Sequence, residues 1–108
     1  MVVQSRKFIV YVLELDQSIK QKGRFVDRNP KGWMACLYVG STGKTAEERF
    51  VDHAEGRDSG SAFIVGHVLK LREDLAPPDR FDNRHQAERF ERRTANRLRH
   101  LGYFVWQN

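Results

Sequence analysis

The feature that most constrains the fold is the run Phe8–Leu15, which contains β-branched, aromatic and aliphatic residues interrupted only by Glu14. Such residues are enriched in strands whose side chains are largely buried. Met34–Val39 has the same character and predicts a second strand. Between them, residues 16–33 are rich in Lys, Gln and Gly and include Asn29-Pro30, which favours a long hairpin connection.

Helix signals follow the second strand. After a Gly- and Ser-containing loop, Thr45 and Glu48 have the spacing of a capping box, which predicts a helix from Thr45 to about His53 or Ala54. A second, longer helix is predicted from Asn83 to Leu101. Apolar or small residues recur there at steps of three and four, and Gly102 is a typical terminator.

The remaining segments give weaker patterns. Residues 62–71 are ambiguous, and the pattern favours a short helical turn leading into a strand at His67–Leu71. Pro77-Pro78 ends this segment because proline cannot donate a hydrogen bond to a strand ladder. Tyr103–Trp106 is expected to close the chain as a short strand or an extended tail. The order of elements predicts an α/β fold with a small antiparallel sheet flanked by helices.

The totals fit one domain over residues 1–108, because hydrophobic residues make up 40% of the chain and charged residues 31%. The net charge of +5 favours polyanionic partners such as nucleic acid. Arginines, whose forked donors suit phosphate oxygens, are concentrated in one stretch: Arg80, Arg84, Arg89, Arg92, Arg93, Arg97 and Arg99.

Cysteine content and hydropathy indicate the cellular environment in which the protein is expected. Cys36 is the only cysteine, which excludes an internal disulfide and a cysteine-rich zinc site, and a reducing, cytoplasmic environment is expected. The start of the chain has no apolar run of signal-peptide length, and no stretch is long enough to cross a bilayer. We therefore expect a protein that is neither exported nor embedded in a membrane.

Several short motifs occur in a distinctive order. Ile9-Val10-Tyr11 and Tyr38-Val39-Gly40 each place a tyrosine near a strand end, and Glu48-Arg49-Phe50 with His53 follows on a helix. Ala87 and Glu91 lie on the later helix. In this order the motifs resemble the GIY-YIG nuclease family over nearly the whole chain. The resemblance implies the α/β fold of that family. It also implies the activity of a metal-dependent endonuclease, which hydrolyses the phosphodiester bonds of DNA.

The resemblance assigns roles to individual residues. Tyr11 would take or relay the proton of the attacking water, and Tyr38 would hydrogen-bond the phosphate or the water. Arg49 would neutralise a phosphate oxygen, and His53, one helical turn later, would assist proton transfer or contact phosphate. Glu91 would bind one divalent ion, Mg²⁺ or Mn²⁺, completed by waters and the scissile phosphate.

The loop between the second strand and the first helix adds candidate DNA contacts. Gly40 would let the backbone turn tightly beside a phosphate, and Lys44 would contact the DNA backbone. Gly43-Lys44-Thr45 also ends the phosphate-binding loop of nucleotide hydrolases. That loop needs a glycine five residues before Gly43, where Tyr38 stands, so nucleotide hydrolysis is excluded.

Two departures from the family pattern leave an alternative open. Ile9 replaces the opening glycine of the first motif. The connection at 16–33 is longer than the usual hairpin of the family, and this extra length would cover or extend the DNA-binding face. The alternative is a catalytically weak or inactive nucleic-acid-binding or adaptor module on the same scaffold. Neither a protein partner nor a second copy is identified by the sequence. Each site residue also has a plain structural role open to it, such as sheet packing for the tyrosines.

Overall fold

The computed structural model describes residues 7–57 and 59–107, and a five-stranded sheet lies at its centre. The strands follow the order β3-β1-β2-β5, and β4 pairs with the other end of β1. The strands are β1 Phe8–Leu15, β2 Cys36–Thr42, β3 Val68–Leu71, β4 Arg80–Phe81 and β5 Phe104–Trp106. The helices are α1 Gly23–Asp27, α2 Ala46–Ala54 and α3 Arg84–Leu101, with 3-10 turns at Gln17–Gln21, Ser59–Ile64 and Glu73–Leu75.

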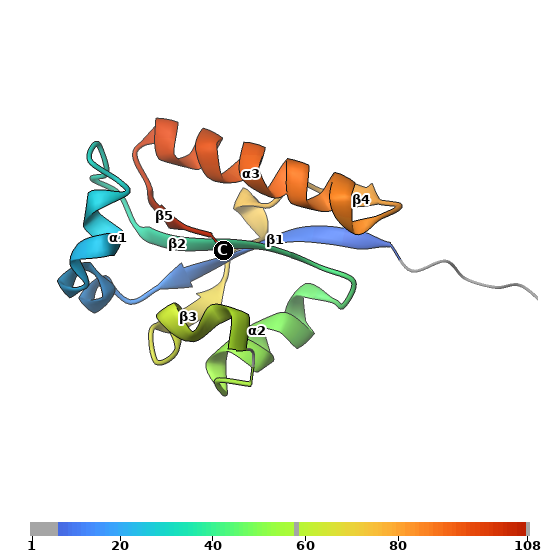
Figure 1. Ribbon diagram of the computed structural model, residues 1–108, viewed down its shortest axis with the longest axis horizontal. Coiled ribbons are helices and arrows are strands. Elements are labelled where there is room, and N and C mark those ends of the chain that lie inside the picture. Colours follow the sequence, from blue (N-terminus) through green and yellow to red (C-terminus); the bar gives the residue numbers. More distant parts are fainter. Residues whose placement is uncertain (1–6, 58, 108) are drawn as a thin grey trace, which may run out of the picture.

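The register of β1 and β2 determines which side chains share a face of the sheet. Tyr11 pairs with Gly40 and Leu13 pairs with Tyr38, so these four residues lie on one face, since side chains alternate along a strand. Tyr11, Leu13 and Tyr38 belong to a core cluster against which Phe50 of α2 packs. The other face packs against α3, and Figure 1 shows α2 and α3 on opposite sides of the sheet.

The sheet is mixed, which corrects the expectation of an antiparallel sheet. β1 pairs antiparallel with β2, β3 and β4, but β5 runs parallel to β2. A parallel pair requires a long crossover, which the segment containing α2 and α3 provides. β5 pairs only with Cys36–Tyr38, so the rest of β2, Val39–Thr42, has an open edge in the described chain.

The predicted helix boundaries are confirmed. Thr45 and Glu48 form both hydrogen bonds of a capping box at the start of α2. Asn83 caps α3, its side chain accepting a hydrogen bond from the Gln86 amide. Gly102 ends α3 with φ of +111°, a left-handed conformation that glycine adopts without strain.

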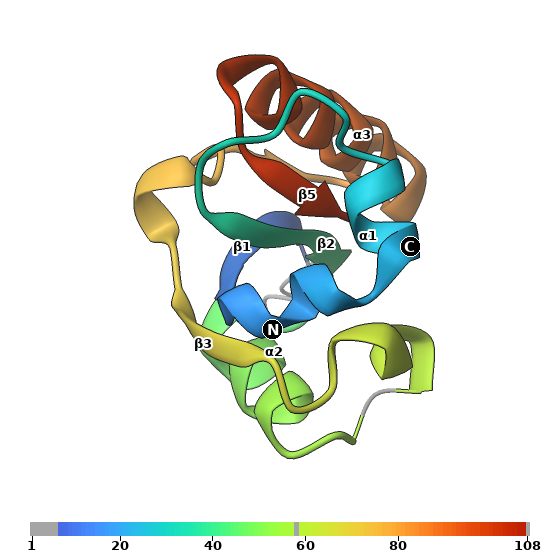
Figure 2. The ribbon, with the colours of Figure 1, turned by 90° about the vertical axis from the view of Figure 1, so that its left-hand side faces the viewer.

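Residues 16–33 join the antiparallel strands β1 and β2, as the predicted long hairpin connection requires, and they contain short helices that the sequence did not predict. Ile19 from the first 3-10 turn and Phe25 from α1 are both buried, and they fix this segment to the core. Asn29 makes two hydrogen bonds with the backbone of Val105 in β5, with its Oδ1 2.9 Å from the Val105 nitrogen and its Nδ2 3.1 Å from the Val105 oxygen. Figure 2 shows the chain after α1 passing over β5 toward the end of α3.

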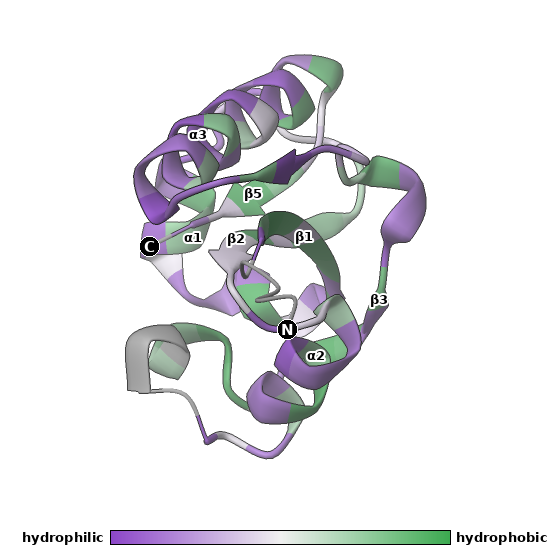
Figure 3. Ribbon diagram, turned by 90° about the vertical axis from the view of Figure 1, so that its right-hand side faces the viewer, coloured by the Kyte–Doolittle hydropathy of each residue, from purple (hydrophilic) through white to green (hydrophobic). Residues whose placement is uncertain are grey.

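Hydropathy follows the layers. Apolar strands lie between α3 and α2, and the outer surface of α3 is hydrophilic (Figure 3). Over residues 7–57 and 59–107, no helix combines the length and apolar character needed to span a membrane.

Candidate active site

Four of the predicted site residues lie together beneath α2. Tyr11 of β1 and Tyr38 of β2 share a face of the sheet, and Arg49 and His53 are one turn apart on the helix that covers this face. The ring of His53 lies 5.0 Å from that of Tyr38 and 5.8 Å from that of Tyr11. We call these four residues the tyrosine cluster.

Hydrogen bonds give the cluster a direction for proton movement. The Tyr11 hydroxyl lies 2.7 Å from Nε2 of His53, and Nε of Arg49 donates to the same hydroxyl at 3.4 Å. The Arg49 guanidinium also lies 3.4 Å from Nε2 of His53. Because a guanidinium only donates, Nε2 is the acceptor, and the hydroxyl of Tyr11 points its proton toward His53.

The environment keeps both Tyr11 and His53 uncharged. Burial raises the pKa of Tyr11 well above its usual value, and Tyr38 raises it further, while Arg49 opposes the shift. Burial and the positive charge of Arg49 lower the pKa of His53 to about 4. His53 is 1% exposed, and in the described chain its Nδ1 has no hydrogen-bond partner. The imidazole is therefore neutral at neutral pH.

Gly40 has a different role from the one predicted. It lies within β2 rather than at a turn, opposite Tyr11. A Cβ at this position would lie 2.6 Å from the Tyr11 hydroxyl and 2.9 Å from the ring of Tyr38. Gly40 therefore provides the space in which the two tyrosines approach each other, and a larger residue would displace them.

Asp52 holds the cations at the mouth of the cluster. Its Oδ2 lies 3.3 Å from Nη1 of Arg49 and 3.0 Å from Nζ of Lys44. Hydrogen bonding from Lys44 lowers the pKa of Asp52, so the carboxylate stays charged. The surface pairing that the sequence left open for Arg49 is thus present, and it orients the guanidinium toward Tyr11.

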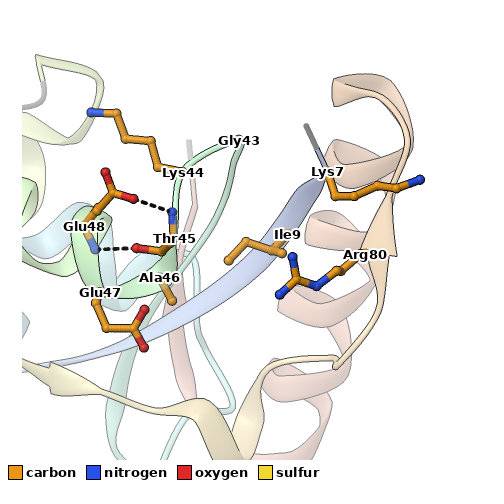
Figure 4. Close-up of a pocket in the computed structure, with 9 residues that line it drawn as sticks. All are labelled: Lys7, Ile9, Gly43, Lys44, Thr45, Ala46, Glu47, Glu48 and Arg80. Atoms are coloured by element: carbon orange, nitrogen blue, oxygen red, sulfur yellow. Dashed lines mark hydrogen bonds between the residues drawn. The ribbon is translucent and has the colours of Figure 1, made fainter. Parts of the chain in front are cut away.

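Two cavities adjoin this end of the molecule. One, of about 510 Å³, separates the start of α2 from β1 and β4, and Figure 4 shows Ile9 and Arg80 facing Thr45–Glu48 across it. The other, of about 330 Å³, lies at the open edge of β2 and is lined by Ser41, Lys44, Arg49 and Arg84, among others. We call it the β2-edge cavity; its lining is strongly cationic.

Glu91 approaches the same edge from the opposite face of the sheet. Its Oε1 accepts a hydrogen bond from Ser41 at 2.9 Å, and its Oε2 accepts one from Gln107 at 3.0 Å. Within the described chain, it makes no hydrogen bond with the tyrosine cluster. Ser41 therefore connects Glu91 to the wall of the β2-edge cavity, whereas Arg49 lines that cavity from the side of α2.

A single carboxylate, that of Glu91, is the group at this edge of β2 that could hold a magnesium-like ion. Among residues 7–57 and 59–107, no group of three or more His, Cys, Asp and Glu side chains could hold a metal. Mg²⁺ commonly binds one or two carboxylates and keeps its waters. Glu91 is half-buried and fixed by Ser41 and Gln107, and each carboxylate oxygen keeps a further lone pair. Burial raises the pKa of Glu91, a cost that a bound cation would offset.

The sequence did not identify the partners of Glu91. Ser41 is predictable in retrospect, because it follows Gly40 and so faces the opposite side of the strand. Gln107 carries no such signal.

No known family model matches the chain, and no curated protein or solved structure matches it either.

Proposed function

We propose that the protein is a metal-dependent endonuclease that hydrolyses DNA phosphodiester bonds, with a fold of the GIY-YIG type. The observation that carries the proposal is the hydroxyl of Tyr11, held between a guanidinium donor and an imidazole acceptor 2.7 Å away. A cationic cavity lies directly beside this arrangement. Few structural roles require a buried phenol, a neutral histidine and an arginine in one hydrogen-bonded chain.

The proposed chemistry follows the hydrogen bonds. A water attacks phosphorus, its proton passes to the Tyr11 oxygen, and the Tyr11 proton passes to Nε2 of His53. The new P–O bond forms as the bond to the leaving oxygen breaks, and that oxygen keeps the bonding electron pair and takes a proton from solvent water. Arg49 stabilises the charge that collects on the phosphoryl oxygens. The double transfer avoids a free phenolate and leaves His53 as an imidazolium, and the anionic phosphate beside it would offset the cost that burial imposes on this charge.

Glu91 would hold the metal ion at the edge of β2, with Ser41 and Gln107 orienting its oxygens. When bound, the ion would polarise a phosphoryl oxygen and neutralise charge on it. Lys44 and Arg84, which line the cavity with Arg49, would contact neighbouring phosphates.

One observation favours a second candidate, a nucleic-acid-binding module with little or no activity. Tyr11 is only 1% exposed, and Tyr38 only 3%. A phenol this enclosed reaches a water at the phosphate only if Arg49 shifts. If Arg49 stays against Asp52, the cationic edge still binds DNA without cutting it.

Cleavage assays distinguish the two candidates. Supercoiled plasmid, blunt duplex, branched and single-stranded DNA are incubated with the protein in Mg²⁺ or in chelator. We expect cutting that requires Mg²⁺ and that falls by about 10²-fold or more in Arg49→Ala. Arg57→Ala is the matched control, since Arg57 lies just beyond α2 and pairs with Glu55 at the surface. DNA binding with no cutting of any substrate would favour the binding module.

A further inference from the structure

A second cationic cavity lies at the far end of α3 from the tyrosine cluster. Its volume is about 470 Å³, and it separates the loop after α1 from the last turn of α3. The residues that matter here are Arg28, Lys31 and Trp33 from the loop and Arg99 and His100 from the helix. We call it the Trp33 groove. The loop belongs to the long connection at 16–33, which the proposed active site does not use.

Trp33 presents its indole to solvent on a firmly held backbone. The side chain is 75% exposed. The amides of Trp33 and Met34 both donate to the Gly102 oxygen, at 2.8 and 2.9 Å. A Cβ at Gly102 would lie 2.3 Å from the indole nitrogen, so the ring rests against this glycine. An indole that is exposed and yet positioned is typical of a binding surface.

The positive charges around Trp33 are not neutralised by the protein. In the described chain, neither Arg28, Lys31 nor Arg99 forms an ion pair with a carboxylate. Arg99 instead donates to Asn29, Asn96 and the Val105 oxygen, at 3.2 to 3.3 Å. Burial and the nearby Arg28 guanidinium lower the pKa of Arg99, as expected where like charges gather. The groove therefore complements an anion.

The combination of groups favours a nucleic acid over an acidic peptide. Carboxylates would satisfy the cations, but they would leave the exposed indole without a flat partner. Unpaired bases stack on aromatic rings while basic side chains bind the adjacent phosphates. Paired bases in a duplex are already stacked and do not offer this face.

We propose that the Trp33 groove binds an unpaired stretch of nucleic acid, with one base stacked on Trp33 and flanking phosphates on Arg28, Lys31 and Arg99. The proposal deepens the proposed function and rests on it for the choice of substrate. Arg84 and Arg99 lie at opposite ends of α3, about 22 Å apart at 1.5 Å per residue. That separation corresponds to about six phosphates along one strand of B-form DNA. The preferred substrate is therefore a duplex with a single-stranded arm.

Equilibrium binding tests the groove without any cleavage. Labelled oligothymidine and blunt duplex are titrated in chelator at low salt with wild type, Trp33→Ala, Trp33→Phe and the control Leu101→Ala. Leu101 is the neighbouring exposed apolar residue, at 53% exposure. We expect Trp33→Ala to weaken oligothymidine binding by roughly 5- to 150-fold, the worth of one stacked base. The affinity of Trp33→Phe for oligothymidine should lie between those of the wild type and Trp33→Ala. The affinity of each variant for duplex should differ from that of the wild type by less than twofold.

Other outcomes overturn the proposal. Unchanged oligothymidine binding by Trp33→Ala would do so, as would an equal loss for duplex and single strand, or tighter wild-type binding of a polyglutamate peptide. Thermal unfolding of each variant shows whether the fold is kept, and Trp33→Phe provides the comparison if the alanine variant unfolds. Failure of the nuclease proposal gives a different pattern: wild type cuts nothing, yet Trp33→Ala still loses affinity for oligothymidine.

Discussion

At the scale of single residues, the central feature is a tyrosine hydroxyl that accepts from Arg49 and donates to His53. His53 is positioned to accept the proton of the Tyr11 hydroxyl. When this hydroxyl takes a proton from water, it can therefore pass its own proton to His53. We therefore expect Tyr11→Phe to keep the ring that fills the core but to slow DNA cleavage by about 10²- to 10⁴-fold.

The control for this variant is Tyr103→Phe, with blunt duplex as the substrate because Tyr103 also lines the Trp33 groove. Tyr103 packs against the α3 side of the sheet, away from the cluster. Single-turnover cleavage rates measure the effect. Loss of the Tyr11 hydroxyl should cost about 1 kcal/mol of unfolding free energy, so the folded population remains high. Equal rates for Tyr11→Phe and Tyr103→Phe would remove Tyr11 from the mechanism.

The low pKa of His53 should make the stability of the folded protein depend on pH. This pKa is about 4 in the folded protein, below the ordinary value of 6.5 that a histidine has in an unfolded chain. Between these values the unfolded chain binds a proton that the folded chain does not, so stability is complete above pH 6.5 and falls as the pH decreases toward 4. By pH 4.5 the loss should be about 2–3 kcal/mol.

Urea unfolding of wild type and His53→Gln at pH 7.5 and 4.5 measures this term. Carboxylates such as Asp52 contribute their own acid dependence to both proteins, and the difference between them isolates His53. We expect the wild type to lose about 2–3 kcal/mol more than the variant. Parallel losses would mean that His53 is not held neutral by burial.

At the scale of elements, the start of α2 positions Arg49 and His53. Thr45 and Glu48 exchange both hydrogen bonds of a capping box there. Thr45→Ala removes the side-chain acceptor and should cost about 1 kcal/mol of unfolding free energy, whereas Thr45→Ser should cost much less because it retains the hydroxyl. Thermal unfolding of the two variants makes the comparison. An equal loss in both would point to the methyl group instead of the cap.

The elements also show what the sequence could and could not predict. β1 and α3 matched their predicted bounds because local signals mark them: a continuous apolar run, an Asn83 cap and a Gly102 terminator. α1 is five residues long and forms because Phe25 is buried, a tertiary effect with no local pattern. β4 has only two residues and depends on pairing with β1.

The candidate site divides in the same way. The spacing of four between Arg49 and His53 predicted that they share a face, as the structure has it. The position of Glu91 on the opposite side of the sheet depends on how α3 packs, and the sequence contains no information on this. The exposure of Trp33 follows from the path of the loop over Gly102, which no local sequence pattern marks.

At the scale of the whole molecule, α3 connects two cationic cavities that differ in kind. The β2-edge cavity adjoins the tyrosine cluster and Glu91, and the Trp33 groove carries an exposed indole. Both cavities are lined by basic side chains, as suits a polyanionic partner. In the proposed complex, the scissile phosphate lies at the β2-edge cavity. The Trp33 groove binds the single-stranded arm and so selects the substrate.

The proposed metal-dependent cleavage is tested by the Mg²⁺ dependence of DNA cutting by Glu91→Gln, compared with Glu88→Gln. Both variants neutralise a glutamate of α3, but only Glu91 is oriented by Ser41 and Gln107 at the edge of β2. We predict that Glu88→Gln cuts at the wild-type rate and that Glu91→Gln, with unchanged thermal unfolding, does not cut at any Mg²⁺ concentration. Wild-type cutting by Glu91→Gln would contradict the account.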